Sequence, residues 1–350
     1  ITLSITINQQ QQQQQNPDII DNNSDPTQTP PPTLTKYYRV IIKVPYQVAN
    51  EIYTSILASI CHLPMPMMRV LESPHNEYQS MSKHLLVLSR DLDNDLHTQL
   101  KKDLRRRHFI IMQHVEGRSL SEMNSREILT EKKLLQLGKI MAFDLFVNNF
   151  DSFFYYWDNS NSVVPVGDLL ANDVPTGDGW HFTIMHTKVN FILNSSFTIC
   201  YHKHINRLKS LLYSIFANPF VESSLLQKMR DTVNRQHGAG LNDQAGLLIQ
   251  HGLIGGIQTI VTELTPDILK DTKDRVKSLI CREDNHNGHS DSSSICWKRG
   301  FDSIYLPFLF DIYDKFEQFS SSPRSKLNCG GGGCTCQSSS HNHKTKGIKK

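Results

Sequence analysis

The chain has 350 residues, which is enough for one large domain or two modest ones with a well-buried core. Its 37 Lys and Arg residues nearly balance its 34 Asp and Glu residues, and the net charge of +3 gives no support for a nucleic-acid partner. Hydrophobic residues make up 38% of the chain, which excludes a fully disordered or fibrous protein, and the longest apolar stretch, 246–261, is interrupted by polar residues and too short for a membrane span.

Both ends of the chain are polar and compositionally biased. Residues 1–35 contain a Gln run at 9–15 and a Pro run at 30–32, and residues 320–350 are rich in Ser, Gly, Cys and His. Such segments cannot bury enough apolar surface to offset the entropy lost on ordering, so we predict a disordered arm at 1–35 and a disordered tail at 320–350.

The cysteines and the first residues bear on where the protein works. Seven cysteines are scattered without a disulfide pattern, which predicts a reducing compartment. The sequence shows no basic segment followed by an apolar one at its start, so no secretory signal is expected, and the missing initiator Met is consistent with a fragment. We therefore expect a cytoplasmic protein.

The first ordered part is predicted to be rich in strands. An aromatic and β-branched run at 37–44 predicts a strand, and apolar residues at helical spacing predict a helix over 48–60. Further strands are expected at 67–71, 84–88 and 109–112, with a turn at 114–117 leading out of the last one.

The rest of the ordered chain is predicted to be mainly helical. A helix is expected from about 134 to 148, and a pair of strands joined by the Asp-, Pro- and Gly-rich segment 172–179 follows it. Later helices are expected at 205–216, 223–232, 245–263, 266–280 and 301–319. The order predicts an α+β protein in two lobes, a strand-rich lobe at 36–112 and a connecting hinge with a helical lobe at 113–319.

Three charged residues stand where phosphoryl-transfer chemistry needs them. Lys43 ends an apolar strand and Glu51 lies in the helix that follows, so the two can form an ion pair that directs an ammonium group at phosphate oxygens. Asp151 follows the Asn-rich end of the 134–148 helix and suits a base that accepts a hydroxyl proton. Taken alone, Lys43 is better explained as a surface lysine on an edge strand, and Asp151 is as well explained as an ordinary helix-end residue. The order of these residues and elements along the chain favours a protein kinase.

Three segments carry a more specific resemblance. Residues 43–71, the stretch Met-Gln-His-Val-Glu-Gly-Arg-Ser-Leu at 112–120, and the stretch from Leu137 to Asp151 resemble the catalytic domain of the actin-fragmin kinase family. The resemblance extends over about residues 37–320, and Leu-Gly-Lys-Ile to Asn-Asn-Phe-Asp is its most specific part. It implies a bilobal, protein-kinase-like fold and ATP- and Mg²⁺-dependent serine/threonine phosphorylation, with actin, or an actin-fragmin-like complex, as substrate and partner.

The resemblance also implies roles for individual residues. Lys43 matches the lysine that contacts the ATP phosphates, with Glu51 as its partner, and Asp151 matches the catalytic-loop aspartate. Asp168 stands at a metal-binding position where the family expects Asn. The hinge against which adenine would lie is matched by Met112, Gln113, His114, Val115 and Glu116.

Two departures from the family pattern concern the phosphates and the metal. His186 stands where the family has a metal-binding aspartate, and neutral imidazole is a poor ligand for Mg²⁺. The family also covers the phosphates with a glycine-containing hairpin before the lysine, whereas no glycine precedes Gly117 here. Either the sequence starts after that hairpin or the hairpin has been lost.

Three interpretations follow from these residues. The first is an active serine/threonine kinase, and the second is a pseudokinase that binds actin or a regulator without catalysis. The third is an unrelated α+β binding protein in which the matches are coincidental. The last interpretation predicts that Lys43, Glu51 and Asp151 do not share a site.

Overall fold

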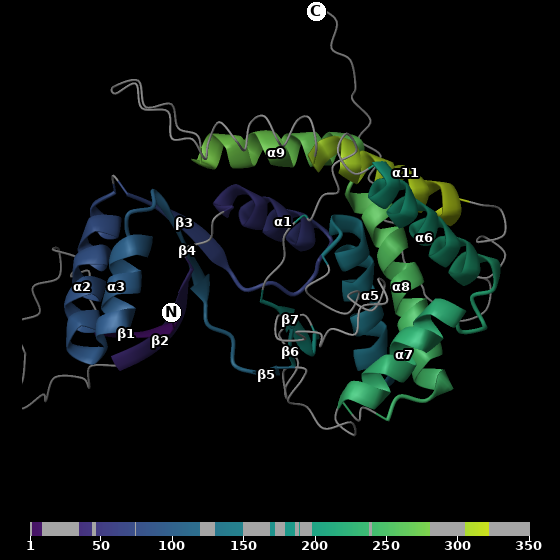
Figure 1. Ribbon diagram of the computed structural model, residues 1–350, viewed down its shortest axis with the longest axis horizontal. Coiled ribbons are helices and arrows are strands. Elements are labelled where there is room, and N and C mark those ends of the chain that lie inside the picture. The colour runs from purple at the N-terminus through teal and green to yellow at the C-terminus, as the bar shows by residue number, and fades with distance from the viewer. Residues whose placement is uncertain are drawn as a thin grey trace, which may run out of the picture.

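The computed structural model describes residues 2–8, 35–43, 47–73, 75–119, 130–149, 169–171, 179–185, 189, 198–237, 240–280 and 305–321. These residues form a strand-rich region that contains the first helices and a helical region that contains most of the rest of the described chain (Figure 1). The α+β class predicted from the sequence is confirmed.

The strand-rich region is built on a four-stranded antiparallel sheet in the order β1-β2-β4-β3. Its strands are β1 (Thr2–Asn8), β2 (Thr35–Lys43), β3 (Met68–Glu72) and β4 (His108–Gln113). The helices α2 (Asn76–Leu92) and α3 (Asn94–Asp103) lie beside this sheet (Figure 1). A small apolar core joins the two layers, made of Ile42, Leu71, Tyr78, Leu85 and Phe109.

Helix α1 (Val48–Ile60) connects the two regions. Its buried residues include Tyr53 and Leu57, which belong to the large core that continues into the helical region. The Tyr53 hydroxyl donates a hydrogen bond of 3.2 Å to the backbone carbonyl of Leu269 in α9 (Pro266–Ile280). Helix α1 is therefore hydrogen-bonded to a helix that lies more than 200 residues later in the chain.

The centre of the helical region is the crossing of α5 (Glu131–Val147) and α8 (Asp243–Glu263). Glycines allow their backbones to touch: a Cβ at Gly138 would lie 2.1 Å from the Ile249 carbonyl oxygen, and one at Gly252 would lie 2.1 Å from that of Leu135. Any side chain at either position would push the helices apart, which explains a glycine within the apolar run of α5.

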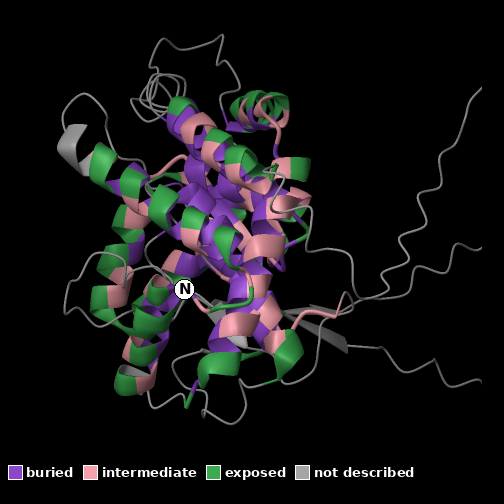
Figure 2. Ribbon diagram, turned by 90° about the vertical axis from the view of Figure 1, so that its right-hand side faces the viewer, coloured by how far each residue is buried: buried purple, intermediate pink, exposed green. Residues whose placement is uncertain are grey.

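Three further helices complete the helical region: α6 (Thr198–Ala217), α7 (Ser224–His237) and α11 (Leu306–Ser320). Figure 2 shows buried residues concentrated in the interior, with exposed residues on the outer faces of the helices. Helix α8 has the length and hydropathy of a membrane span, but half of that span is buried inside the protein, where it packs against α5, α6, α7 and α11. It is the core helix of this region.

A second, three-stranded antiparallel sheet lies next to α5 (Figure 1). Its strands are β5 (Arg118–Ser119), β6 (Leu169–Ala171) and β7 (Phe182–Ile184). Gln136 of α5 fixes the start of β7, since its side chain donates to the Gly179 carbonyl at 2.8 Å and accepts from the His181 amide at 2.9 Å. The β6–β7 pair was predicted from the sequence and is confirmed.

Most predicted elements are found close to their predicted bounds. Helices α1 and α9 have the predicted bounds, α5, α6, α7 and α8 overlap their predictions, and α11 begins five residues later than expected. The strands β2, β3 and β4 are likewise confirmed. The tail from 322 and most of the arm lie outside the described residues.

Two predictions were wrong. Residues 84–88 are not a strand but part of α2, because Tyr78 and Leu85, seven residues apart, pack one helix face onto the sheet. The predicted disordered arm at 1–35 contains strand β1, which pairs with β2 along its whole length. The Leu-Ser-Ile-Thr-Ile run near its start is rich in β-branched residues, and these favour a strand when a partner edge is present.

Candidate functional site

The site predicted around Lys43 begins at the junction of β2 and α1. Lys43 is the last residue of β2, and Glu51 lies in the first turn of α1. The Lys43 Nζ is 3.8 Å from Glu51 Oε2, with 24% of the lysine side chain and 10% of the glutamate side chain exposed. The structure thus brings this predicted pair together and leaves part of the lysine accessible.

The end of β7 also lies next to Lys43. Lys43 Nζ donates a hydrogen bond of 3.0 Å to the Met185 carbonyl, and the Ile184 amide donates one of 2.8 Å to the Pro64 carbonyl. The ammonium group therefore lies between a carboxylate from α1 and a backbone oxygen that is 142 residues away in sequence. Such an arrangement fixes the position of a cation that can bind an anionic ligand.

Asn50 is a member of the site that the sequence analysis missed. It is buried, at 1% exposure, beside Glu51 in the first turn of α1. Its side chain donates to the Val189 carbonyl at 3.0 Å and accepts from the Val189 amide at 2.8 Å. The sequence shows only an asparagine directly before Glu51, and asparagine is an ordinary residue near helix starts, so nothing in the sequence marked it.

The predicted hinge residues continue from strand β4. Met112 is buried, and β4 lies beside β2 with Met112 opposite Ile41 and Ile110 opposite Lys43. The Gln113 amide donates to the Met67 carbonyl at 2.9 Å and the His114 amide to the Arg39 carbonyl at 3.2 Å. After these bonds the chain runs through Val115 and Glu116 toward β5. The segment thus leaves the sheet from the strand adjacent to Lys43.

The end of α5 explains part of the Asn-rich motif. Asn148 ends the helix in a left-handed conformation, with φ of 55°. Asn149 then folds back, donating from its backbone to the Asp144 carbonyl at 2.8 Å and from its side chain to the buried Asp144 carboxylate at 3.0 Å. Asp144 and the two asparagines therefore shape the turn that precedes Asp151.

The remaining predicted site residues, Asp151, Asp168 and His186, lie outside the described residues. Within the part of the chain that the structure describes, no three His, Cys, Asp or Glu side chains gather as a metal site. Lys43 offers a cation suited to phosphate oxygens, but the described side chains provide no set of ligands for Mg²⁺.

Comparison with known proteins gives the family. The family model described as actin-fragmin kinase, catalytic, matches residues 5–257 of this chain. The chain belongs to the actin-fragmin kinase catalytic family. The match includes the second part of β1, the Lys43–Glu51 pair, α5 and most of α8, and it ends before α9 and α11. Because the family is shown, an unrelated α+β binding protein is excluded.

Individual relatives agree with the family model. Three Dictyostelium discoideum proteins, provisionally named actin-fragmin kinases, are 38%, 36% and 34% identical over 289, 282 and 296 residues. The alignments cover 81%, 79% and 83% of this chain and 67%, 62% and 69% of the relatives. The chain thus spans about two thirds of the length of these relatives.

Proposed function

We propose that this chain is a nucleotide-binding, protein-kinase-like domain that transfers phosphate from ATP to serine or threonine of an actin-related substrate. The observation that carries the proposal is the part-exposed side chain of Lys43, whose ammonium is held by Glu51 and by the Met185 carbonyl where β2 meets α1. Membership of the actin-fragmin kinase catalytic family supports this reading.

The other roles complete the proposal. The hinge from Met112 to Glu116 would receive the adenine, because it leaves the sheet beside the strand that carries Lys43. Asp151 would accept the hydroxyl proton, and Asp168 would hold Mg²⁺. The bilobal kinase-like fold, a cytoplasmic location and actin or an actin-fragmin-like complex as partner belong to the same proposal.

Nucleotide binding is the first test. Thermal unfolding of the wild type is followed while ATP is added, with and without Mg²⁺, beside Lys43→Met, which keeps the length of the side chain and removes its charge. ATP at about 100 times its dissociation constant stabilises the folded wild type by roughly 2.7 kcal/mol, which raises its melting temperature. The shift should vanish in Lys43→Met, and a wild type that does not respond to ATP would refute the nucleotide site.

A second candidate function is a pseudokinase that binds ATP or a partner without phosphoryl transfer. It is favoured by His186, since a neutral imidazole supplies no anionic oxygen for Mg²⁺. Phosphorylation of actin, alone and with fragmin, separates the two functions once ATP binding is established. Transfer by the wild type supports the kinase, whereas Mg²⁺-dependent binding or transfer that appears only in His186→Asp supports the pseudokinase.

A further inference from the structure

The side-chain amide of Asn50 is hydrogen-bonded through both its nitrogen and its oxygen. Its Nδ2 donates to Gln47 Oε1 at 3.2 Å and to the Val189 carbonyl at 3.0 Å. Its Oδ1 accepts from the Val189 amide at 2.8 Å. The Thr54 hydroxyl donates to the Asn50 backbone carbonyl at 2.8 Å and lies 3.3 Å from Oδ1. Both donors of the amide are therefore used and Oδ1 has the Val189 amide as its donor, so the side chain is held in one orientation between Gln47 and Val189.

The Asn50–Val189 pair imitates a step of a β-ladder. One side chain exchanges two hydrogen bonds with the amide and the carbonyl of a single residue, as two strands do. Val189 is buried, at 1% exposure, so neither of its backbone groups could turn to water if Asn50 were shortened. Loss of these bonds would leave buried polar groups without partners, and the chain at 189 would move to satisfy them.

Asn50 and Glu51 are neighbours in α1 but contact different parts of the site around Lys43. Glu51 faces the Lys43 ammonium, Lys43 binds the carbonyl of Met185, and Asn50 binds Val189 four residues further on. Met185 and Val189, the described ends of the segment 185–189, are thus each hydrogen-bonded to residues at the junction of β2 and α1. The first turn of α1 sets the distance between Lys43 and this segment.

We propose that Asn50 is a positioning residue of the nucleotide site: it holds the chain at Val189, and through it the Met185 carbonyl, in register with Lys43. The inference rests on the proposed function, because it gives Asn50 a role in the binding of ATP by Lys43. Asn50 does not touch the nucleotide in this proposal, and it acts through the segment that it holds.

Gln250 provides a matched control. It is also a fully buried amide that binds backbone, accepting from the Ser223 amide and donating to the Val221 carbonyl, each at 2.8 Å. Its partners lie in the connection between α6 and α7, on the opposite side of Figure 1 from strand β2. Asn50→Ala and Gln250→Ala thus remove the same kind of group, and a general loss of stability is expected in both.

The test has two measurements on the full chain. Hydrogen exchange of the peptide covering 184–189, measured without nucleotide, should be faster in Asn50→Ala and unchanged in Gln250→Ala. The dissociation constant for ATP, measured where all variants are folded, should rise about tenfold in Asn50→Ala and stay unchanged in Gln250→Ala. Asn50→Asp, which keeps the shape but cannot donate to the Val189 carbonyl, should change both quantities in the same direction.

Equal ATP affinity in Asn50→Ala and Gln250→Ala would overturn the inference, as would unchanged exchange at 184–189 in Asn50→Ala and Asn50→Asp. A wild type that binds no ATP would instead refute the proposed function. The exchange measurement needs no nucleotide and would still report whether Asn50 holds the segment. The failures of the two proposals are therefore distinguishable.

Discussion

The site around α1 and the polar network around Arg230 both place charged side chains in buried positions, but they connect the chain over very different sequence distances. In the α1 site, formed by Lys43, Asn50 and Glu51, the hydrogen bonds to Met185 and Val189 span 142 and 139 residues. In the Arg230 network, the partners Glu222 and Leu241 lie 8 and 11 residues away. The first joins remote segments, and the second joins the ends of neighbouring helices.

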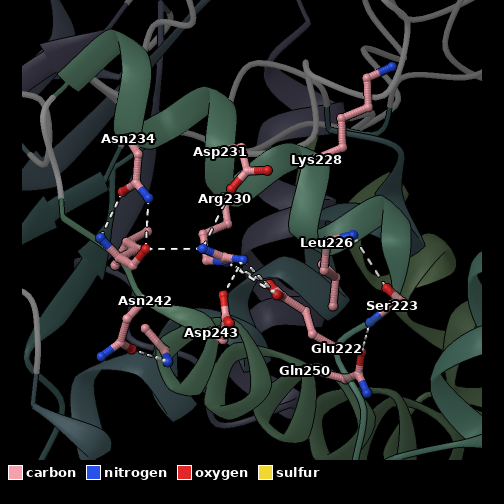
Figure 3. A network of polar contacts seen from close by, with 12 residues as sticks. Glu222, Ser223, Leu226, Lys228, Arg230, Asp231, Asn234, Asn242, Asp243 and Gln250 are labelled. Carbon is pink, nitrogen blue, oxygen red and sulfur yellow. Dashed lines mark hydrogen bonds and ion pairs between the residues drawn. The ribbon is translucent and has the colours of Figure 1, made fainter.

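The Arg230 network joins residues of α7 to the segments on either side of it and to the start of α8 (Figure 3). The Arg230 guanidinium binds both carboxylate oxygens of Glu222, with Nε 3.0 Å from Oε1 and Nη2 3.0 Å from Oε2. It also donates to the Leu241 carbonyl, whose residue exchanges two further bonds with Asn234. The hydrogen bonds to Glu222 raise the pKa of Arg230, so the charge is permanent.

This contrast distinguishes the proposed ligand site around Lys43 from the structural cluster around Arg230. Arg230 is buried with its carboxylate against it, whereas Lys43 keeps a quarter of its side chain exposed beside two segments that meet only in the folded chain. In the proposed site, a ligand would contact this exposed part of Lys43. We therefore expect substitutions in the Arg230 network to change stability alone, and substitutions around α1 to change ligand binding as well.

The largest effect on stability is expected for Arg230→Met. The methionine keeps most of the apolar stem but leaves the largely buried Glu222 carboxylate without its partner, which costs about 3–5 kcal/mol. Urea unfolding measures this loss, and the ATP affinity of the folded variant should equal that of the wild type. Asp243→Asn is the control: this ion-pair partner is 92% exposed, so its loss should cost less than about 1 kcal/mol. A changed ATP affinity in Arg230→Met would remove the contrast.

The close packing of α5 against α8 can be tested by replacing glycines of α8 with alanine, which adds one methyl group. Gly252→Ala places a Cβ against the Leu135 carbonyl and should destabilise the protein by about 1–3 kcal/mol. Gly255→Ala, three residues along the same helix, meets no atom within 4 Å and should stabilise it by about 0.5–1 kcal/mol through helix propensity. Thermal unfolding of the two variants measures the difference, and equal melting temperatures would show that the helices do not cross as closely as described.

The sequence predicted much of the fold because its signals are local. Helix α1 follows from apolar residues four positions apart, and its predicted and observed bounds coincide. The short apolar run at 84–88 fits either a strand or part of a helix, and the contacts of this segment with the sheet decide that it is helical. Helix α3 was not predicted, although Asp93 carries a start signal by accepting hydrogen bonds from the amides of Asp95 and Leu96.

The site was predictable only in part, for a similar reason. Lys43 and Glu51 are eight residues apart, in a strand followed by a helix, so their pairing could be inferred from order. The contacts of Asn50 and Lys43 with residues 189 and 185 join segments that are 139 and 142 residues apart and use backbone groups. Backbone amides and carbonyls are the same in every residue type, so no sequence pattern identifies them as partners.

The smallest expected effect concerns the hydrogen bond between α1 and α9. The hydroxyl groups of Tyr53 and Tyr313 each donate to a backbone carbonyl, that of Leu269 at 3.2 Å and that of Val261 at 3.1 Å. Burial raises the pKa of both phenols, so both stay protonated and able to donate at neutral pH. Tyr53→Phe and Tyr313→Phe should each cost about 1 kcal/mol in urea unfolding.

Ligand binding distinguishes these two tyrosines. Tyr53 lies in the turn after Asn50 and Glu51, so loss of its bond to α9 frees the helix that positions Lys43. We expect ATP binding about two- to threefold weaker in Tyr53→Phe, the size of a partial loss of one hydrogen bond, and unchanged in Tyr313→Phe. If both variants bind ATP as the wild type does, α9 supports the fold of α1 without influencing the site. An equal weakening in both would mean that the affinity follows overall stability, and the distinction between the two regions would fail.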